Sequence, residues 1–299
     1  MPAPSRRLDH RLLALVCAVL ALGAVAYSAW DSVDLAVYVE SGRRFAAGLS
    51  PYGFALPPIG ALFRYSPVFA AGMAPLSGLP FPMVALGWRL VELALLAISV
   101  RGLGWLGVAI VLNPLVVLDL SVANVGTLFL AAMIMVVRWP SARTVTAYAI
   151  LVLLIPKPTL LPVLAWGLWR VRSSWLPLAG VGVAGLAMVL LAPDFGHAIL
   201  SGDRIFGMLQ NLAFLPAWLV AILMASSVAL TVASVRRPRL LGPASVLASP
   251  YYFSYSLVPL LLALVPGPEA ERESAARVRS SAAPAPPAEP PEPLAPPAM

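Results

Sequence analysis

The sequence has little charge and almost none of the side chains on which metal or redox chemistry depends. Only 11% of its 299 residues are charged, and Cys17 is its one cysteine. A single cysteine excludes an intramolecular disulfide and any cysteine-based metal cluster. Two histidines are too few for a histidine-rich metal site. The sequence therefore predicts no bound metal and no cofactor, and it leaves the redox state of the compartment open.

Common motifs for nucleotide binding and hydrolysis are also missing. The chain contains no Walker A loop, no HExxH, no GxSxG and no CxxC. The usual sequence support for phosphate-loop enzymes and zinc hydrolases is therefore absent. The net charge of +7 comes from arginines at the ends of apolar runs and in loops. That distribution is typical of membrane proteins, so we expect no nucleic-acid partner.

Long apolar runs are what the chain has in abundance, since 60% of its residues are hydrophobic. Their length predicts an all-α fold, a polytopic transmembrane helical bundle of about nine spans within residues 1–265. Arg6, Arg7 and Arg11 precede the first run, Leu12 to Trp30. This charge order favours an uncleaved first helix with a cytoplasmic N-terminus in the cell membrane. The two long polar loops, Asp34 to Pro67 and Pro193 to Asn211, would then lie outside.

Residues 266–299 have a different character. Ten of the 31 prolines fall there, among alanines and scattered glutamates. Such a composition cannot bury enough apolar surface to fold. We therefore expect a disordered Pro/Ala-rich tail with no part in chemistry.

The longest polar stretch before the tail runs from Asp34 to Pro67, between the first two apolar runs. Apolar residues recur near helical spacing, which predicts an interfacial amphipathic helix from Leu35 to Ala47, ended by Gly48. Asp34 lies beside an apolar boundary, where its carboxylate could deprotonate an acceptor hydroxyl. The alternative is that Asp31 and Asp34 simply cap the following helix, with Asp34 at the N-cap position.

The only lysine, Lys157, lies between two prolines in the middle of the apolar segment from Arg143 to Trp169. A lysine at the centre of a span costs about 3 kcal/mol on insertion scales. The prolines indicate a broken helix that could open a cavity. We expect Lys157 to bind a phosphate or carboxylate there, the alternative being a lysine that extends to an interface.

Other charged residues give weaker indications. Arg89 and Glu92 are three apart on one helix face and are expected to pair. His197 and four arginines could contact a lipid-linked phosphate or simply lie among headgroups: Arg43, Arg44, Arg64 and Arg204.

Several short motifs, in this order, resemble one family. They are DLAVY from Asp34, Gly48 with SPY at 50–52, RYSP at 64–67, PLSGLP at 75–80, the Lys157–Pro158 pair and SPYYFSYSLVP at 249–259. Their order and spacing are similar to those of membrane glycosyltransferases of the C-type fold, in the branch of polyprenyl-phosphate-mannose-dependent mannosyltransferases. The similarity covers roughly residues 11 to 265.

The resemblance implies a sugar donor linked to polyprenyl phosphate and a first-loop aspartate acting as base. That aspartate maps to Asp34 rather than Asp31, because Asp34 is followed by L-x-V-Y. The implied reaction moves a hexose, mannose in this branch, to a lipid or glycan acceptor on the outer face of the cell envelope. The residues expected to bind substrate are Tyr38, Tyr52, Arg64, Tyr65, Lys157, His197 and Arg204.

Two other functions fit the same sequence. A transporter or lipid flippase would place Lys157 in a substrate path at the membrane midplane. An inactive relative would serve as a scaffold. A transporter would expose Lys157 to both sides in turn, whereas a transferase would open its site only to the outside and to lipid.

Overall fold

The computed structural model describes residues 4–27, 32–56, 61–172, 175–195, 216–248 and 254–268. These parts of the chain are helical except for two strands of two residues each, β1 (Ala55–Leu56) and β2 (Ala61–Leu62), which pair antiparallel. The all-α class expected from the sequence is therefore confirmed for the described residues. The tail beyond residue 268, like His197, Arg204 and Asp31, lies outside them.

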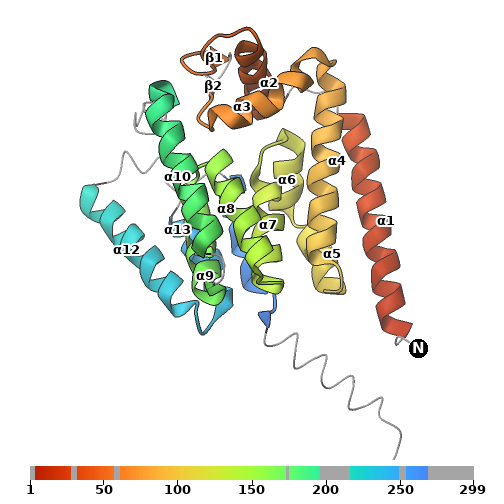
Figure 1. Ribbon diagram of the computed structural model, residues 1–299. Helices are drawn as coiled ribbons and strands as arrows, with labels where there is room; N and C mark the ends of the chain where they lie inside the picture. The colour runs from red at the N-terminus through yellow and green to blue at the C-terminus, as the bar shows by residue number, and fades with distance from the viewer. Residues whose placement is uncertain are drawn as a thin grey trace, which may run out of the picture.

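The helices form a bundle whose members run between two ends, the upper and lower ends of Figure 1. They are α1 (Pro4–Tyr27), α4 (Phe81–Val100), α5 (Trp105–Val111), α6 (Pro114–Val122), α7 (Gly126–Arg138), α8 (Ala142–Leu154), α9 (Leu161–Arg170), α10 (Trp175–Leu191), α12 (Ala217–Ala233) and α13 (Leu241–Leu247). Three 3₁₀ helices complete it: η2 (Pro158–Leu160), η5 (Pro238–Leu240) and η6 (Ser254–Leu264). The core is apolar where α4 packs on α7, with Leu96, Leu130 and Ile134 fully buried.

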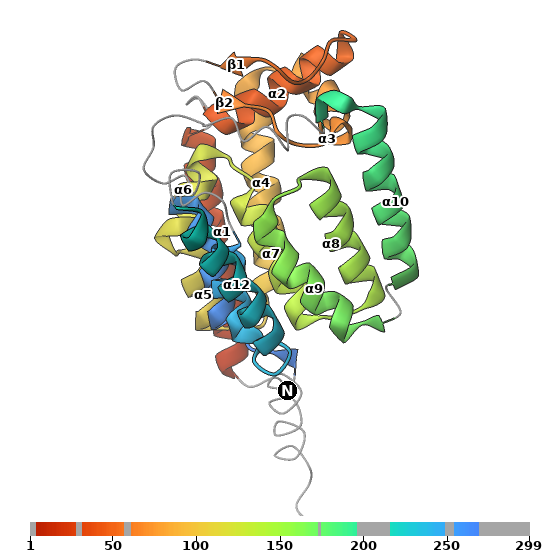
Figure 2. The same ribbon diagram turned by 90° about the vertical axis from the view of Figure 1, so that its left-hand side faces the viewer.

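A small layer covers the upper end of the bundle (Figures 1 and 2). It consists of α2 (Val33–Ala46), the β1–β2 hairpin, α3 (Pro67–Met73) and the 3₁₀ helix η1 (Ala74–Gly78). The amphipathic helix expected at Leu35 to Ala47 is thus present, and it begins two residues earlier. Gly48 follows it with φ +70°, a conformation that favours glycine, and the amide of Leu49 donates back to the carbonyl of Arg44.

The polarity of α12 is reversed relative to a helix on the surface of a water-soluble protein. Two serines point inward: Ser227 in the helix donates to the carbonyl of Ala244, and Ser234 at its C-cap is fully buried. Its apolar side chains point outward, with Val228 64% and Val232 68% exposed. An apolar outer face with polar groups satisfied inside is the arrangement that lipid favours.

Judged by helix length, fewer membrane spans are supported than the sequence predicts. Among the described helices, α4 alone is long and apolar enough to cross a bilayer, and the bent pair α5–α6 would make a second such segment. The other apolar helices are shorter, including α7, α8 and α12. The expected nine spans stay a prediction.

Two apolar segments, residues 143–169 and 240–265, are folded back on themselves, although the nine-span prediction counts each of them as one span. Residues 143–169 form the hairpin of α8 and α9, in which Gly167 near the end of α9 lies against Val145 near the start of α8. The hydroxyl of Tyr148 donates to the carbonyl of Leu160 and closes this hairpin. Residues 240–265 are likewise divided between α13 and η6. Prolines stop the helices, but only tertiary contacts reverse the chain.

Three glycines in α10 have the spacing of a nucleotide-binding motif. Gly180, Gly182 and Gly185 follow the G-x-G-x-x-G pattern of dinucleotide-binding proteins. They lie inside a helix, however, without the preceding strand and tight turn that phosphate binding requires. The pattern therefore gives no support to nucleotide binding.

The contact between α2 and η1 depends on Gly42. A Cβ atom there would lie 2.5 Å from the carbonyl carbon of Met73 and 2.8 Å from the amide nitrogen of Ala74. We expect Gly42→Ala to destabilise the protein by about 1–3 kcal/mol, because backbone atoms cannot move aside cheaply. Thermal unfolding of the purified protein measures this. The control is Gly87→Ala in α4, where the added methyl meets nothing within 4 Å; equal melting temperatures for the two variants would contradict the close contact.

Candidate functional site

The candidate site lies where the inner face of α2 meets the upper ends of α6, α7 and α8. Asp34 and Tyr38 come from α2, and Lys157 comes from the turn between α8 and η2. The ring of Tyr65 lies 5.2 Å from that of Tyr38, and the Lys157 ammonium lies 5.6 Å from the Tyr65 ring centre. The fold therefore brings together four of the residues selected from the sequence.

Asp34 is not the N-cap of α2, although that was one of the two interpretations of the sequence. Ser32 occupies that position, and its hydroxyl donates to the carbonyl of Val122 at the end of α6. The Asp34 carboxylate accepts no hydrogen bond from the described residues. Burial raises its pKa, and the positive charge of Lys157 partly opposes that rise. A carboxylate with these properties is suited to accept a proton.

Lys157 is not at the centre of a span, contrary to the sequence interpretation. It lies in the turn of the α8–α9 hairpin, where its amide donates to the carbonyl of Ile155. Its ammonium lies over two aromatic rings, 5.6 Å from the centre of Tyr65 and 5.3 Å from that of Phe129. It forms no ion pair with a described carboxylate. A half-buried cation held by rings alone can still accept an anionic ligand.

A tyrosine network fixes the wall of the site. The hydroxyls of Tyr38 and Tyr65 are 3.0 Å apart, and the Tyr38 hydroxyl also donates to Asn124 Oδ1 at 3.2 Å. Tyr52 donates to the carbonyl of Tyr65 at 2.8 Å, and burial together with Asp194 raises its pKa, so this phenol stays a donor. Tyr52 therefore acts on the site through Tyr65.

Asp119 in the last turn of α6 and Asn124 in the turn that follows belong to the site but are absent from the residues selected above. Asp119 is fully buried, and its Oδ2 accepts from the amide of Thr127 at 2.5 Å. Its Oδ1 has no hydrogen-bond partner among the described residues, and the carboxylate interacts electrostatically with Lys157 and Asp34. The available signal was an acidic residue flanked by leucines in an apolar run, which indicates a functional position.

Arg89 and Glu92 do not form the ion pair expected from their spacing. Arg89 donates to the carbonyls of Leu120 and Ser121 at the C-terminal end of α6. Glu92 instead lies within electrostatic range of the Leu128 amide in the first turn of α7, although without close hydrogen-bond geometry. Arg89 thus faces the negative C-terminal end of α6, and Glu92 faces the positive N-terminal end of α7.

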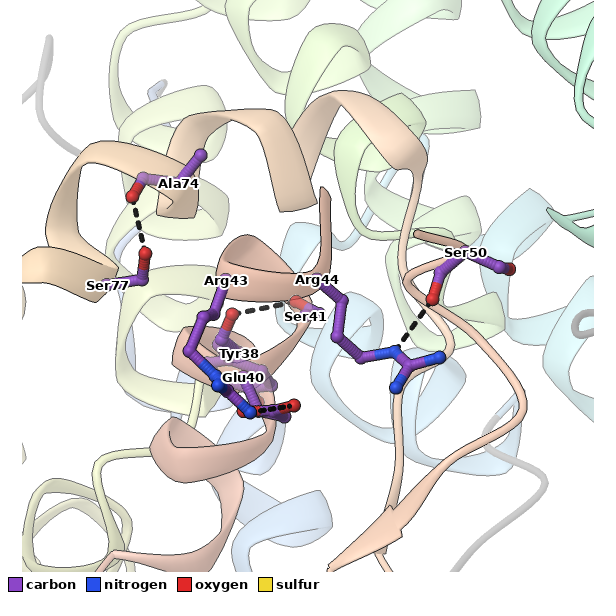
Figure 3. Close-up of polar contacts among 8 residues, drawn as sticks. All are labelled: Tyr38, Glu40, Ser41, Arg43, Arg44, Ser50, Ala74 and Ser77. Atoms are coloured by element: carbon purple, nitrogen blue, oxygen red, sulfur yellow. Dashed lines mark hydrogen bonds and ion pairs between the residues drawn. The ribbon is translucent and has the colours of Figure 1, made fainter. Parts of the chain in front are cut away.

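The remaining arginines of the first loop are engaged locally (Figure 3). Arg43 forms a two-point ion pair with Glu40, at 2.8 and 2.9 Å, on the outer side of α2. Arg44 donates to the carbonyl of Ser50 and lies 5.2 Å from the centre of the Phe54 ring. Arg64 is half-buried in the segment that follows β2, next to Tyr65. Among the described residues, no group of three metal-binding side chains is present.

We expect Asp34→Asn to leave the protein at least as stable as wild type near neutral pH. A raised pKa means that the native state binds the Asp34 proton more tightly than the unfolded state does. Ionisation therefore costs native stability above the raised pKa, and that cost disappears below the unfolded value of about 3.9. The gain in melting temperature should accordingly shrink as pH falls from 7 to 4. The control is Glu40→Gln, and a variant less stable than wild type at pH 7 would instead indicate a stabilising pair with Lys157.

Comparison with protein-family models, curated proteins and solved structures finds no match to this chain. The grounds for a function are therefore the motif resemblance and the geometry around Asp34 and Lys157.

Proposed function

We propose that the protein is an integral-membrane glycosyltransferase that moves a hexose from a polyprenyl-phosphate donor to a lipid or glycan acceptor. The motif resemblance implies mannose as the hexose. The proposed location is the cell membrane, with the N-terminus in the cytoplasm and the α2 end of the bundle outside. The reaction needs no nucleotide, because the lipid phosphate is itself the leaving group.

The observation that carries the proposal is the relation of Asp34 to Lys157. The two opposite charges lie close enough to influence each other, yet they form no ion pair. In an apolar bundle such a pair would normally close, since each unpaired charge is costly. Leaving the carboxylate and the ammonium apart supports a site in which a substrate occupies the space between a base and a phosphate-binding cation.

In this mechanism Asp34 removes the proton of the acceptor hydroxyl. The oxygen attacks C1 of the sugar from the face opposite the phosphate, and the bond from C1 to the phosphate oxygen breaks with its electron pair. The anomeric centre is inverted, and the proton remains on Asp34. Lys157 neutralises the charge that develops on the departing phosphate. Tyr38 and Tyr65, held by Asn124 and Tyr52, shape the sugar side of the site.

The position of the site favours a transferase over the transporter alternative. The transporter reading needs Lys157 at the midplane of the bundle. Lys157 is instead in the turn that α8 and α9 present toward the α2–α3 layer, and the amide of Ser66 donates to the carbonyl of Leu154 just before that turn. A site at one end of the bundle fits an enzyme that receives its donor from one leaflet.

Asp34→Asn should abolish transfer while the protein still folds and inserts. The assay incubates membranes containing the full-length protein with radiolabelled polyprenyl-phosphate mannose and follows the formation of labelled glycolipid. The matched control is Glu40→Gln, which removes a carboxylate from the outer side of the same helix. Retained activity in Asp34→Asn, or equal loss in Glu40→Gln, would show that Asp34 is not the base.

Lys157→Met should weaken donor binding without lowering the melting temperature. Loss of a charge-assisted contact worth about 1.5–3 kcal/mol corresponds to roughly ten- to a hundredfold in affinity. The native fold loses no ion pair, because Lys157 makes none with a described carboxylate. Lys157→Arg should recover only part of the affinity, since a planar guanidinium needs a different geometry. A structural lysine would give the opposite pattern, with a lower melting temperature and unchanged donor affinity.

A further inference from the structure

A second polar feature lies at the opposite end of the bundle from the candidate site. A cavity of about 540 Å³ opens where α12 ends and η5 begins, at the lower end in Figure 1. Its lining consists of Val232, Ala233, Val235, Arg236, Arg237 and Leu240. This volume lies within the range of small-molecule binding sites, and the wall is apolar apart from the two arginines.

The positive charge that lines this cavity is not balanced by a carboxylate of the described residues. Neither Arg236 nor Arg237 forms a side-chain hydrogen bond or ion pair with any described residue. The chain contains no aspartate or glutamate between Arg204 and Glu269, while Arg239 adds a third positive charge. Two neighbouring guanidinium groups without a carboxylate partner are suited to a phosphate, which can accept bidentate hydrogen bonds from each.

The surface next to the cavity is suited to an acyl chain. Val228 and Val232 lie one helical turn apart on the outer face of α12 and are 64% and 68% exposed, and Val232 also lines the cavity. At the other end of the helix, Trp218 is 64% exposed. The 17 residues of α12 span about 26 Å, close to the thickness of a bilayer core. A tryptophan at one end and arginines at the other are the interfacial anchors of a lipid-facing helix.

We propose that this cavity binds the phosphate headgroup of an anionic phospholipid, with an acyl chain along the Val228–Val232 face of α12. The inference rests on the membrane placement proposed above and not on the transferase chemistry. Arg236 and Arg237 hold the headgroup, and the apolar lining receives the glycerol and the upper part of the chain. The α2 end and this end of the bundle would then face opposite leaflets.

The test is to measure bound lipid on the full-length protein by native mass spectrometry after exchange into detergent containing either phosphatidylglycerol or phosphatidylcholine. Wild type should retain phosphatidylglycerol about tenfold or more above phosphatidylcholine, and Arg236→Gln/Arg237→Gln should lose that preference. The matched control is Arg143→Gln/Arg172→Gln, which removes the same charge from exposed arginines outside the cavity. It should retain the preference.

Three results would overturn the inference. They are equal retention of the two lipids by wild type, unchanged preference in the cavity variant, and equal loss in the control variant. A third variant, truncated after Pro268, tests residues 269–299, with their five glutamates and three arginines, as an alternative occupant. Lipid binding that appears only after truncation would assign the cavity to the tail. Arg236→Lys/Arg237→Lys keeps the charge and should retain most of the preference, which separates loss of binding from loss of folding. Release of the chain from membranes by high salt without detergent would refute the membrane placement itself.

Discussion

The turn between α6 and α7 is the point on which the candidate site depends, because polar groups from α2 and α4 meet there inside an apolar bundle. Ser32 binds the carbonyl of Val122, Tyr38 binds Asn124, and Arg89 binds the carbonyls of Leu120 and Ser121. A backbone that turns in an apolar interior must find partners for its free amides and carbonyls. Here those partners are side chains that also orient α2 and α4.

The same turn carries local strain. Ala123 has φ +50° and ψ +47° and is fully buried, and among the described residues it is the one non-glycine with positive φ. This conformation costs roughly 1–2 kcal/mol for an alanine. Gly126, three residues later in the chain, packs directly against Asp119. A Cβ atom at position 126 would lie 2.4 Å from Asp119 Oδ1, which favours glycine there. Strain and close packing at one turn, next to unpaired buried charge, are typical of a site where function outweighs stability.

The two ends of the bundle differ in their electrostatics. At the α2 end both signs of charge are present: Asp34 and Asp119 lie within electrostatic range of Lys157, and Arg43 pairs with Glu40. At the other end, Arg236, Arg237 and Arg239 have no carboxylate near them in the sequence. An asymmetric distribution of this kind is expected when one end receives a reacting substrate and the other lies among anionic headgroups.

Composition and local pattern alone determined the all-α class, the amphipathic helix after Asp34 and its termination at Gly48, because these depend on hydrophobic periodicity and on backbone preferences of single residues. They also selected Asp34 and Lys157, since unusual charged residues in apolar surroundings are visible without a structure, whereas Tyr38 and Tyr65 were selected through the family resemblance. Only the tertiary structure decided that Lys157 lies in a hairpin turn, that Arg89 and Glu92 separate, and that Asp119 and Asn124 join the site. The physical reason is that a proline breaks a helix through its own backbone geometry, which the sequence reveals. The partner of a buried charge depends instead on which helix end or aromatic ring packs against it, and that is decided by the tertiary structure.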